Sequence, residues 1–174
     1  SLANNIDNNL LIIPYGIGNS LLDSWANGDN SLLNRSLLGN LKKRNINVDL
    51  FLFHQGETDA FTVSNFSKNI EKSNYSKKYL SNLLKLIDQT RIFFPESYFG
   101  LSIVSKCYKG RESNFITDSQ KEVTKIRSKV FISADSDSIY SRRFRYDGCH
   151  FNLKGAEALS NQYKDSFMQN IIKN

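Results

Sequence analysis

An apolar run passes directly into a group of polar side chains in residues 51–59, Phe-Leu-Phe-His-Gln-Gly-Glu-Thr-Asp. The apolar half is short and continuous, which is typical of a buried β-strand between turn signals. The polar half would then lie at the carboxyl end of that strand, where parallel α/β sheets bind their ligands. This stretch therefore predicts a strand of a parallel sheet and part of a functional site.

Further short apolar runs alternate with longer amphipathic stretches along the chain. The predicted strands are residues 10–14, 48–53, 99–104 and 130–133. The predicted helices are residues 31–44, 75–94, 113–127 and 153–171. Asn152 can cap the last helix, whose inner stripe is Ala156, Leu159, Tyr163 and Phe167. Continuous apolar strands separated by helices predict an α/β fold with a mostly parallel sheet covered on both faces.

Length and composition limit the classes of function. The 174 residues fit one domain, 1–174, and the net charge of +6 is scattered over several segments, so we expect no nucleic-acid partner. No apolar run approaches the ~20 residues that a membrane span needs. Cys107 and Cys149 can form a bridge only if the fold brings them together, and two free thiols are the expectation. The compartment stays open, with a secreted or cell-surface location favoured.

A second polar group, Asp147 and His150, stands just before the last predicted helix. A carboxylate close to an imidazole can fix its tautomer and leave the other ring nitrogen free to act as a general base. The alternative is a capping aspartate and a structural histidine. The position at the end of the last strand favours a site.

The polar half of residues 51–59 offers further candidates. The Gln55 amide can donate to a developing oxyanion, Gly56 allows close backbone approach, and Glu57 can orient a histidine or bind substrate. A metal site at His54, Glu57 and Asp59 is the weaker interpretation, because these residues span a strand-to-loop junction. A plain polar loop is the remaining alternative.

The turn after the first apolar run reads Gly-Ile-Gly-Asn-Ser at residues 16–20. It lacks the third glycine and the lysine of nucleotide-binding loops, so we expect no cofactor. Its backbone N–H groups would instead point into the crevice. Trp25 is a packing anchor or, alternatively, a platform for a sugar ring.

Taken together, these runs resemble the SGNH-hydrolase superfamily, in particular its sialate O-acetylesterase-like branch, which includes carbohydrate esterase family six. The branch has a Gly-rich turn followed by a Trp, a His-Gln-Gly-Glu-Ser/Thr-Asp block and a closing Asp-x-x-His before a Gly-containing helix. The matching residues are 13–20 with Trp25, 54–59, and Asp147, His150 and Gly155, and Gln120 stands where the branch commonly has a glutamine.

The resemblance implies a flavodoxin-like three-layer α/β/α sandwich and removal of an acetyl ester from a carbohydrate through an acyl-serine. His150 would be the base and Asp147 its orienting acid, with Glu57 as a rival or auxiliary. The implied oxyanion hole is Gln55 with the backbone of Gly18 and Asn19, which replaces a usual glycine and tolerates left-handed backbone. The implied substrate contacts are His54, Asp59 and Trp25.

The nucleophile of that family, a serine in Gly-x-Ser after a central first strand, is not seen in this chain. The expectation is therefore that the N-terminal nucleophile segment and its strand belong to an upstream or separate piece. Ser20, Ser105 and Cys149 are weaker candidates, since none of them sits in a sharp strand-to-helix elbow. A sheet without its middle strand would leave unpaired edges.

The sequence thus predicts a carbohydrate O-acetylesterase whose partner is an acetylated carbohydrate. A glycan O-acetyltransferase with the same site, and a serine-less protein that binds glycans without catalysis, are the alternatives.

Overall fold

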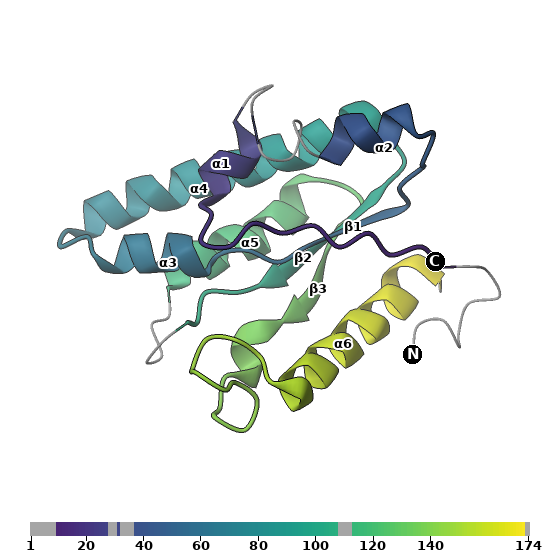
Figure 1. Ribbon diagram of the computed structural model, residues 1–174. Helices are drawn as coiled ribbons and strands as arrows, with labels where there is room; N and C mark the ends of the chain where they lie inside the picture. The colour runs from purple at the N-terminus through teal and green to yellow at the C-terminus, as the bar shows by residue number, and fades with distance from the viewer. Residues whose placement is uncertain (1–9, 28–30, 32–36, 108–112, 173–174) are drawn as a thin grey trace.

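A computed structural model describes residues 10–27, 31, 37–107 and 113–172 (Figure 1). Its sheet is small and open, with three parallel strands in the order β1-β2-β3. The strands are β1 (Leu50–Phe53), β2 (Tyr98–Ile103) and β3 (Val130–Asp135). The predicted α/β class with a parallel sheet is confirmed, and the arrangement is compatible with a flavodoxin-like layered fold.

The hydrophobic core lies between one face of the sheet and a layer of helices. These are α1 (Leu22–Ala26), α2 (Gly39–Lys43), α3 (Glu57–Ser64), α4 (Asn69–Phe93) and α5 (Asn114–Ile126), drawn on the opposite side of the sheet from α6 (Leu153–Phe167) in Figure 1. Leu83 and Ile87 of α4 are fully buried against Leu101 of β2 and its neighbours. The central strand is buried from Phe99 to Ile103, because helices cover it on both faces.

Helix α6 begins as its sequence predicts but packs less deeply than expected. The Asn152 side chain accepts a hydrogen bond from the Gly155 N–H at 3.0 Å, which confirms the predicted cap. The predicted inner stripe is wrong in its degree of burial. Gly155 is the only buried residue of α6, Ala156 is exposed, and Leu159, Tyr163 and Phe167 are half-buried. On its side of the sheet α6 packs chiefly against β3, and this contact covers only part of the apolar stripe. An apolar stripe alone therefore does not ensure burial. A π-helical turn, Met168–Ile172, continues it.

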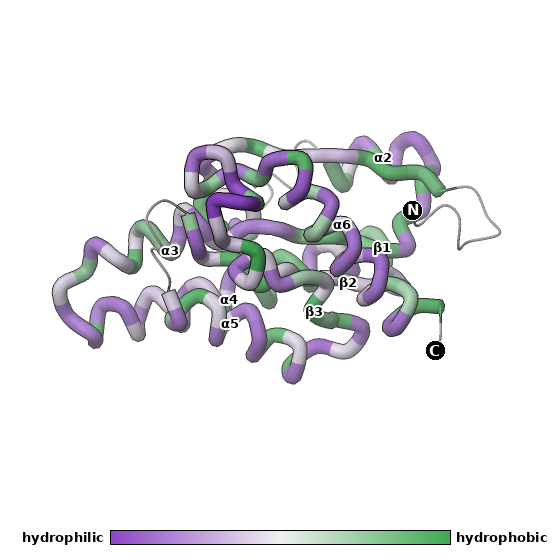
Figure 2. Tube along the Cα trace, turned by 90° about the horizontal axis from the view of Figure 1, so that it is seen from below, coloured by the Kyte–Doolittle hydropathy of each residue, from purple (hydrophilic) through white to green (hydrophobic). Residues whose placement is uncertain are grey.

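The predicted first strand, residues 10–14, is wrong. The segment pairs with no other strand in the described part of the chain, and Leu11 and Ile12 are each 71 % exposed. A strand needs a neighbour for its backbone N–H and C=O groups, and an apolar pattern does not provide one. Figure 2 shows these residues as a hydrophobic length of tube where the described chain begins.

The helices differ from the prediction mainly at their ends. Helix α4 begins at Asn69, six residues before the predicted start at residue 75, and the short α3 was not predicted. Of the helix predicted over residues 31–44, residues 32–36 lie outside the described residues, and α2 occupies the part from Gly39 to Lys43. None of the described helices is both long and apolar enough to cross a bilayer.

Candidate functional site

The clearest chemical geometry is that of Asp147 and His150, in the loop between β3 and α6. One carboxylate oxygen, Oδ2, lies 2.6 Å from His150 Nδ1. The other, Oδ1, accepts the backbone N–H groups of Cys149 at 2.8 Å and His150 at 2.7 Å. Gly148 adopts a φ of 86°, a left-handed conformation in which glycine is unstrained, and so permits this tight turn.

These contacts set the charge and the orientation of the pair. The hydrogen bond from the His150 ring, with those from the loop backbone, lowers the pKa of Asp147 to about 2. The imidazole is 59 % exposed and stacks on the Tyr146 ring, with centroids 5.8 Å apart. Among the described residues no group is hydrogen-bonded to His150 Nε2. One ring nitrogen is therefore held by a carboxylate, while the other has no hydrogen-bond partner among the described residues, as a general base requires.

At the end of β1, His54 and Glu57 form a second pair. His54 Nε2 lies 3.4 Å from Glu57 Oε1, and His54 Nδ1 lies 3.1 Å from the Tyr163 hydroxyl of α6. That hydroxyl is in turn 2.8 Å from Ser102 Oγ of β2. Burial raises the pKa of Glu57, but the hydrogen bond and charge of His54 outweigh burial and hold the pKa below its usual value. Both nitrogens of His54 are thus used inside the protein.

Gln55 and Asp59 are turned inward, which differs from the predicted roles. Gln55 Nε2 donates to Ser20 O at 3.1 Å and to Asp59 Oδ2 at 2.5 Å, so both amide hydrogens are used. Asp59, 2 % exposed, also accepts the Leu22 N–H and the Tyr75 hydroxyl. Burial raises its pKa, more than these hydrogen bonds lower it. Gln55 is therefore not placed to donate to an oxyanion, and Asp59 offers no surface to a substrate. Gln55, just after β1, bonds to Ser20 before α1, and Asp59 joins α3 to α1.

Trp25 is a packing anchor, and the sugar-platform interpretation is wrong. Its side chain is 6 % exposed and makes edge contacts with the rings of Tyr15 and Phe53, at 5.6 and 6.1 Å between centroids. Its indole N–H donates to Ser20 Oγ at 2.7 Å. A ring enclosed in this way has no face left on which to stack a sugar.

The turn around Gly18 and Asn19 lies on the surface beside α1. Asn19 has a φ of 57°, so the expected tolerance of asparagine for left-handed backbone is used here. A Cβ added at Gly16 or Gly18 would meet no atom within 4 Å. The backbone of this turn is therefore open to an approaching group.

Gly56 is required where the ends of β1 and β2 meet. A Cβ at this position would lie 2.2 Å from Val104 O and 2.6 Å from Gln120 Nε2. The fully buried Gln120 side chain accepts the Val104 N–H at 3.0 Å and donates to Val104 O and Gln55 O. The predicted close approach at Gly56 is thus made to the neighbouring strand end, and Gln120 connects the two.

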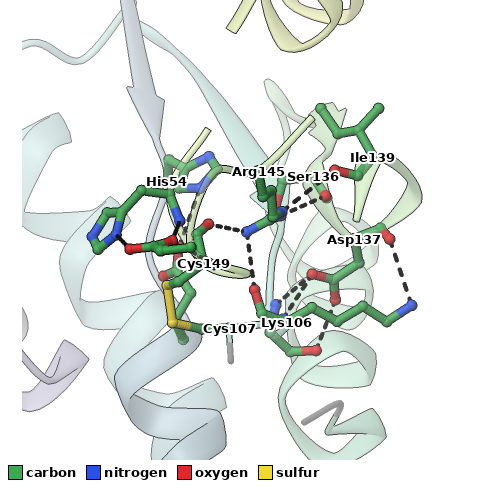
Figure 3. Close-up of a disulfide and its surroundings, with 12 residues drawn as sticks. His54, Lys106, Cys107, Ser136, Asp137, Ile139, Arg145 and Cys149 are labelled. Carbon is green, nitrogen blue, oxygen red and sulfur yellow. Dashed lines mark hydrogen bonds and ion pairs between the residues drawn. A yellow bond between two sulfur atoms is a disulfide. The ribbon is translucent and has the colours of Figure 1, made fainter. Parts of the chain in front are cut away.

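Two features of the site were not predicted. Cys107 and Cys149 form a disulfide, so the expectation of free thiols is wrong, and neither sulfur is available as a nucleophile (Figure 3). Arg145 is 2 % exposed beside this disulfide, and its guanidinium lies 4.2 Å from the centroid of the Phe151 ring. Neither the spacing of the two cysteines nor the sequence around Arg145 indicates either contact.

The two histidine pairs lie close together at the same end of the sheet. The rings of His54 and Phe151 are in edge contact, with centroids 6.4 Å apart, and Phe151 directly follows His150. The described residues contain no group of three or more His, Cys, Asp or Glu side chains suited to a metal ion. The metal interpretation of residues 54–59 also loses Asp59, which points into its own buried network.

The serines considered as nucleophiles are both engaged elsewhere. Ser20 Oγ donates to Ile17 O at 2.8 Å and accepts the Trp25 indole N–H. Ser105 is 1 % exposed, and its hydroxyl donates to Asp137 Oδ2 at 2.7 Å. No serine hydroxyl in the described part of the chain is hydrogen-bonded to His150.

Comparisons of the chain with protein-family models, with curated proteins and with solved structures found no match.

Proposed function

We propose that this chain provides the general base and its orienting carboxylate to a carbohydrate O-acetylesterase of the SGNH type, with a flavodoxin-like three-layer sandwich. The observation that carries the proposal is the 2.6 Å contact between Asp147 Oδ2 and His150 Nδ1 on an imidazole that is 59 % exposed. The substrate class is supported only by the resemblance of residues 54–59 to the sialate O-acetylesterase-like block.

Asp147 is a better orienting acid than its rival Glu57. Its carboxylate is held in place by two backbone N–H groups and stays ionised over the whole physiological range, because its pKa is about 2. An ionised carboxylate at Nδ1 stabilises the imidazolium that forms when Nε2 takes a proton. Glu57 is engaged by His54 and serves better to hold that histidine.

In the proposed reaction, a serine hydroxyl attacks the acetyl carbonyl while His150 Nε2 takes its proton. The same nitrogen returns the proton to the departing sugar oxygen, and water then attacks the acyl-serine in the same manner. The backbone N–H groups of the turn at Gly18 and Asn19 support the oxyanion, since this turn is open. Gln55 takes the supporting role of fixing that turn through Ser20 O.

The serine is proposed to come from a polypeptide segment other than the described residues. Ser20 and Ser105 are engaged in hydrogen bonds away from His150, and both cysteines are oxidised. The edge of β1 that does not face β2 is free of strand pairing in the described chain, and a segment that pairs there would end near residues 54–57. Such a strand would present its carboxyl end at the candidate site.

Fluorophosphonate labelling followed by peptide mapping tests the proposal, together with turnover of a p-nitrophenyl acetate probe and an acetylated oligosaccharide. Label on a serine outside the described residues, and near-total loss of label and turnover in His150→Ala, would support it. Lys154→Ala is the matched control, because Lys154 is an exposed neighbour at the start of α6.

Two other outcomes would redirect the assignment. Turnover that requires a sugar acceptor would favour an O-acetyltransferase with the same site. Absence of label and turnover in folded protein, with glycan binding unchanged in His150→Ala, would favour a non-catalytic glycan-binding protein.

A further inference from the structure

Arg145 is a buried cation bonded to backbone oxygens from three parts of the chain. Nη2 donates to Ser136 O at 2.8 Å, and Nε donates to Ile139 O at 3.4 Å. Nη1 donates to Lys106 O at 3.1 Å and to Cys149 O at 2.5 Å. Figure 3 shows the guanidinium between these groups. No carboxylate of the described residues lies within ion-pair distance of it, so carbonyl oxygens take the place of a counter-ion.

Two of these bonds join the segments that the disulfide also joins. Nη1 connects Lys106, shortly after β2, with Cys149 in the loop that carries Asp147 and His150 (the catalytic loop). The Cys107–Cys149 bond connects the residue after Lys106 with the same loop position. The loop residue Cys149 also donates its N–H to Asp147 Oδ1. The disulfide and the hydrogen bond from Arg145 therefore both hold Cys149, in the loop that carries Asp147 and His150.

The Arg145 guanidinium also contacts aromatic rings at the site. Its face lies over Phe151, and Phe151 contacts the ring of His54. The Tyr140 ring is 5.5 Å away on the side of β3. Arg145 thus lies where the ends of β2 and β3, the catalytic loop and the His54 pair meet.

We propose that Arg145 is the positioning residue of this site, and that with the Cys107–Cys149 disulfide it fixes the loop of Asp147 and His150 against the end of β2. We call Arg145 and the disulfide together the clamp. A catalytic role of the clamp rests on the proposed function, whereas its role in holding the loop does not. Lysine cannot replace Arg145, because an ammonium lacks the planar fork that reaches several carbonyl groups at once.

The experiment compares Arg145→Lys, the double variant Cys107→Ser with Cys149→Ser, and all three substitutions together, in the full chain. Amide hydrogen exchange is measured at His150, whose N–H is bonded to Asp147, and at Leu101 in the central strand. Arg127→Lys is the matched control, since the Arg127 guanidinium likewise donates hydrogen bonds, two of them to Asp88, but on the surface away from the site.

We expect Arg145→Lys to speed exchange at His150 by about tenfold or more relative to Leu101, because hydrogen bonds from a charged donor are lost. The NMR pKa of Asp147 should rise from about 2 toward its usual 3.8. The double cysteine variant should change less, because Arg145 still bridges the segments, and the combined variant should exceed the sum of both effects. Arg127→Lys should change none of these readouts.

The proposal is overturned if Arg145→Lys folds and leaves the His150 amide and the Asp147 pKa unchanged, or if exchange rises equally at Leu101. The second outcome would indicate a general contribution to stability. In turnover assays, a positioning role lowers kcat with little change in KM. If Arg145→Lys speeds exchange only at the His150 amide, and wild type shows no ester turnover, the clamp is retained and the esterase is rejected.

Discussion

The corner around Arg145 and the segment of residues 10–17 are held in opposite ways. Arg145 carries a charge yet is 2 % exposed, because four carbonyl oxygens and a neighbouring disulfide enclose it. Leu11 and Ile12 are apolar yet 71 % exposed. The comparison shows that residue type does not decide burial here. A buried charge persists where protein hydrogen bonds replace those to water, and apolar groups stay exposed where no partner covers them.

The largest expected loss of stability follows removal of the disulfide beside Arg145. The bond closes a loop with a sequence separation of 42. Replacing Cys107 and Cys149 by serine should lower the free energy of unfolding by about 4 kcal/mol, mainly by enlarging the unfolded ensemble. Urea denaturation measures this change. A loss below about 1 kcal/mol would indicate that Arg145 and the loop hydrogen bonds hold the corner without the covalent bond.

A glycine in each region gives a matched comparison of packing. A Cβ at Gly155 would lie 2.2 Å from the backbone oxygen of Phe144, whereas a Cβ at Gly16 would meet nothing within 4 Å. Gly155→Ala should therefore cost about 2–3 kcal/mol through overpacking. Gly16→Ala should change stability by less than about 1 kcal/mol. Thermal and urea unfolding of both variants check this, and similar losses at the two positions would remove the contrast.

The dependence of stability on acidic pH tests the loop that carries Asp147 and His150. The folded state lowers the pKa of Asp147 from 3.8 to about 2, so its contribution is fully present above the unfolded pKa and is lost as pH falls toward about 2. Asp147→Asn should be less stable than wild type at pH 5, and the difference should shrink between about pH 4 and pH 2. Urea midpoints across this range measure it. A constant difference would show that the asparagine acts through something other than charge.

The smallest effect is expected in the exposed segment. Leu11→Ser and Ile12→Ser should each change the free energy of unfolding by less than about 0.5 kcal/mol, since both side chains are already in water. Binding of a hydrophobic dye should fall in both variants. A loss of about 2 kcal/mol in the native protein would instead mean that another segment covers these residues there.

The fold could be predicted where its signal is local. The apolar runs at residues 48–53, 99–104 and 130–133 become β1, β2 and β3, because each finds a parallel neighbour. The equally apolar residues 10–14 form no strand, since pairing depends on a partner that sequence pattern does not contain. For the same reason the apolar periodicity of α6 correctly predicts a helix but overestimates how deeply its apolar side chains are buried.

The candidate site divides in the same way. Asp147 and His150 are three residues apart, so a single turn of backbone suffices to bring carboxylate and ring together, and the sequence alone determined this pair. The inward direction of Gln55 and Asp59 was decided by α1, which supplies the Leu22 N–H. The Cys107–Cys149 bond and the hydrogen bond from Arg145 to Lys106 O were decided only by tertiary structure, because chain segments far apart in sequence meet there.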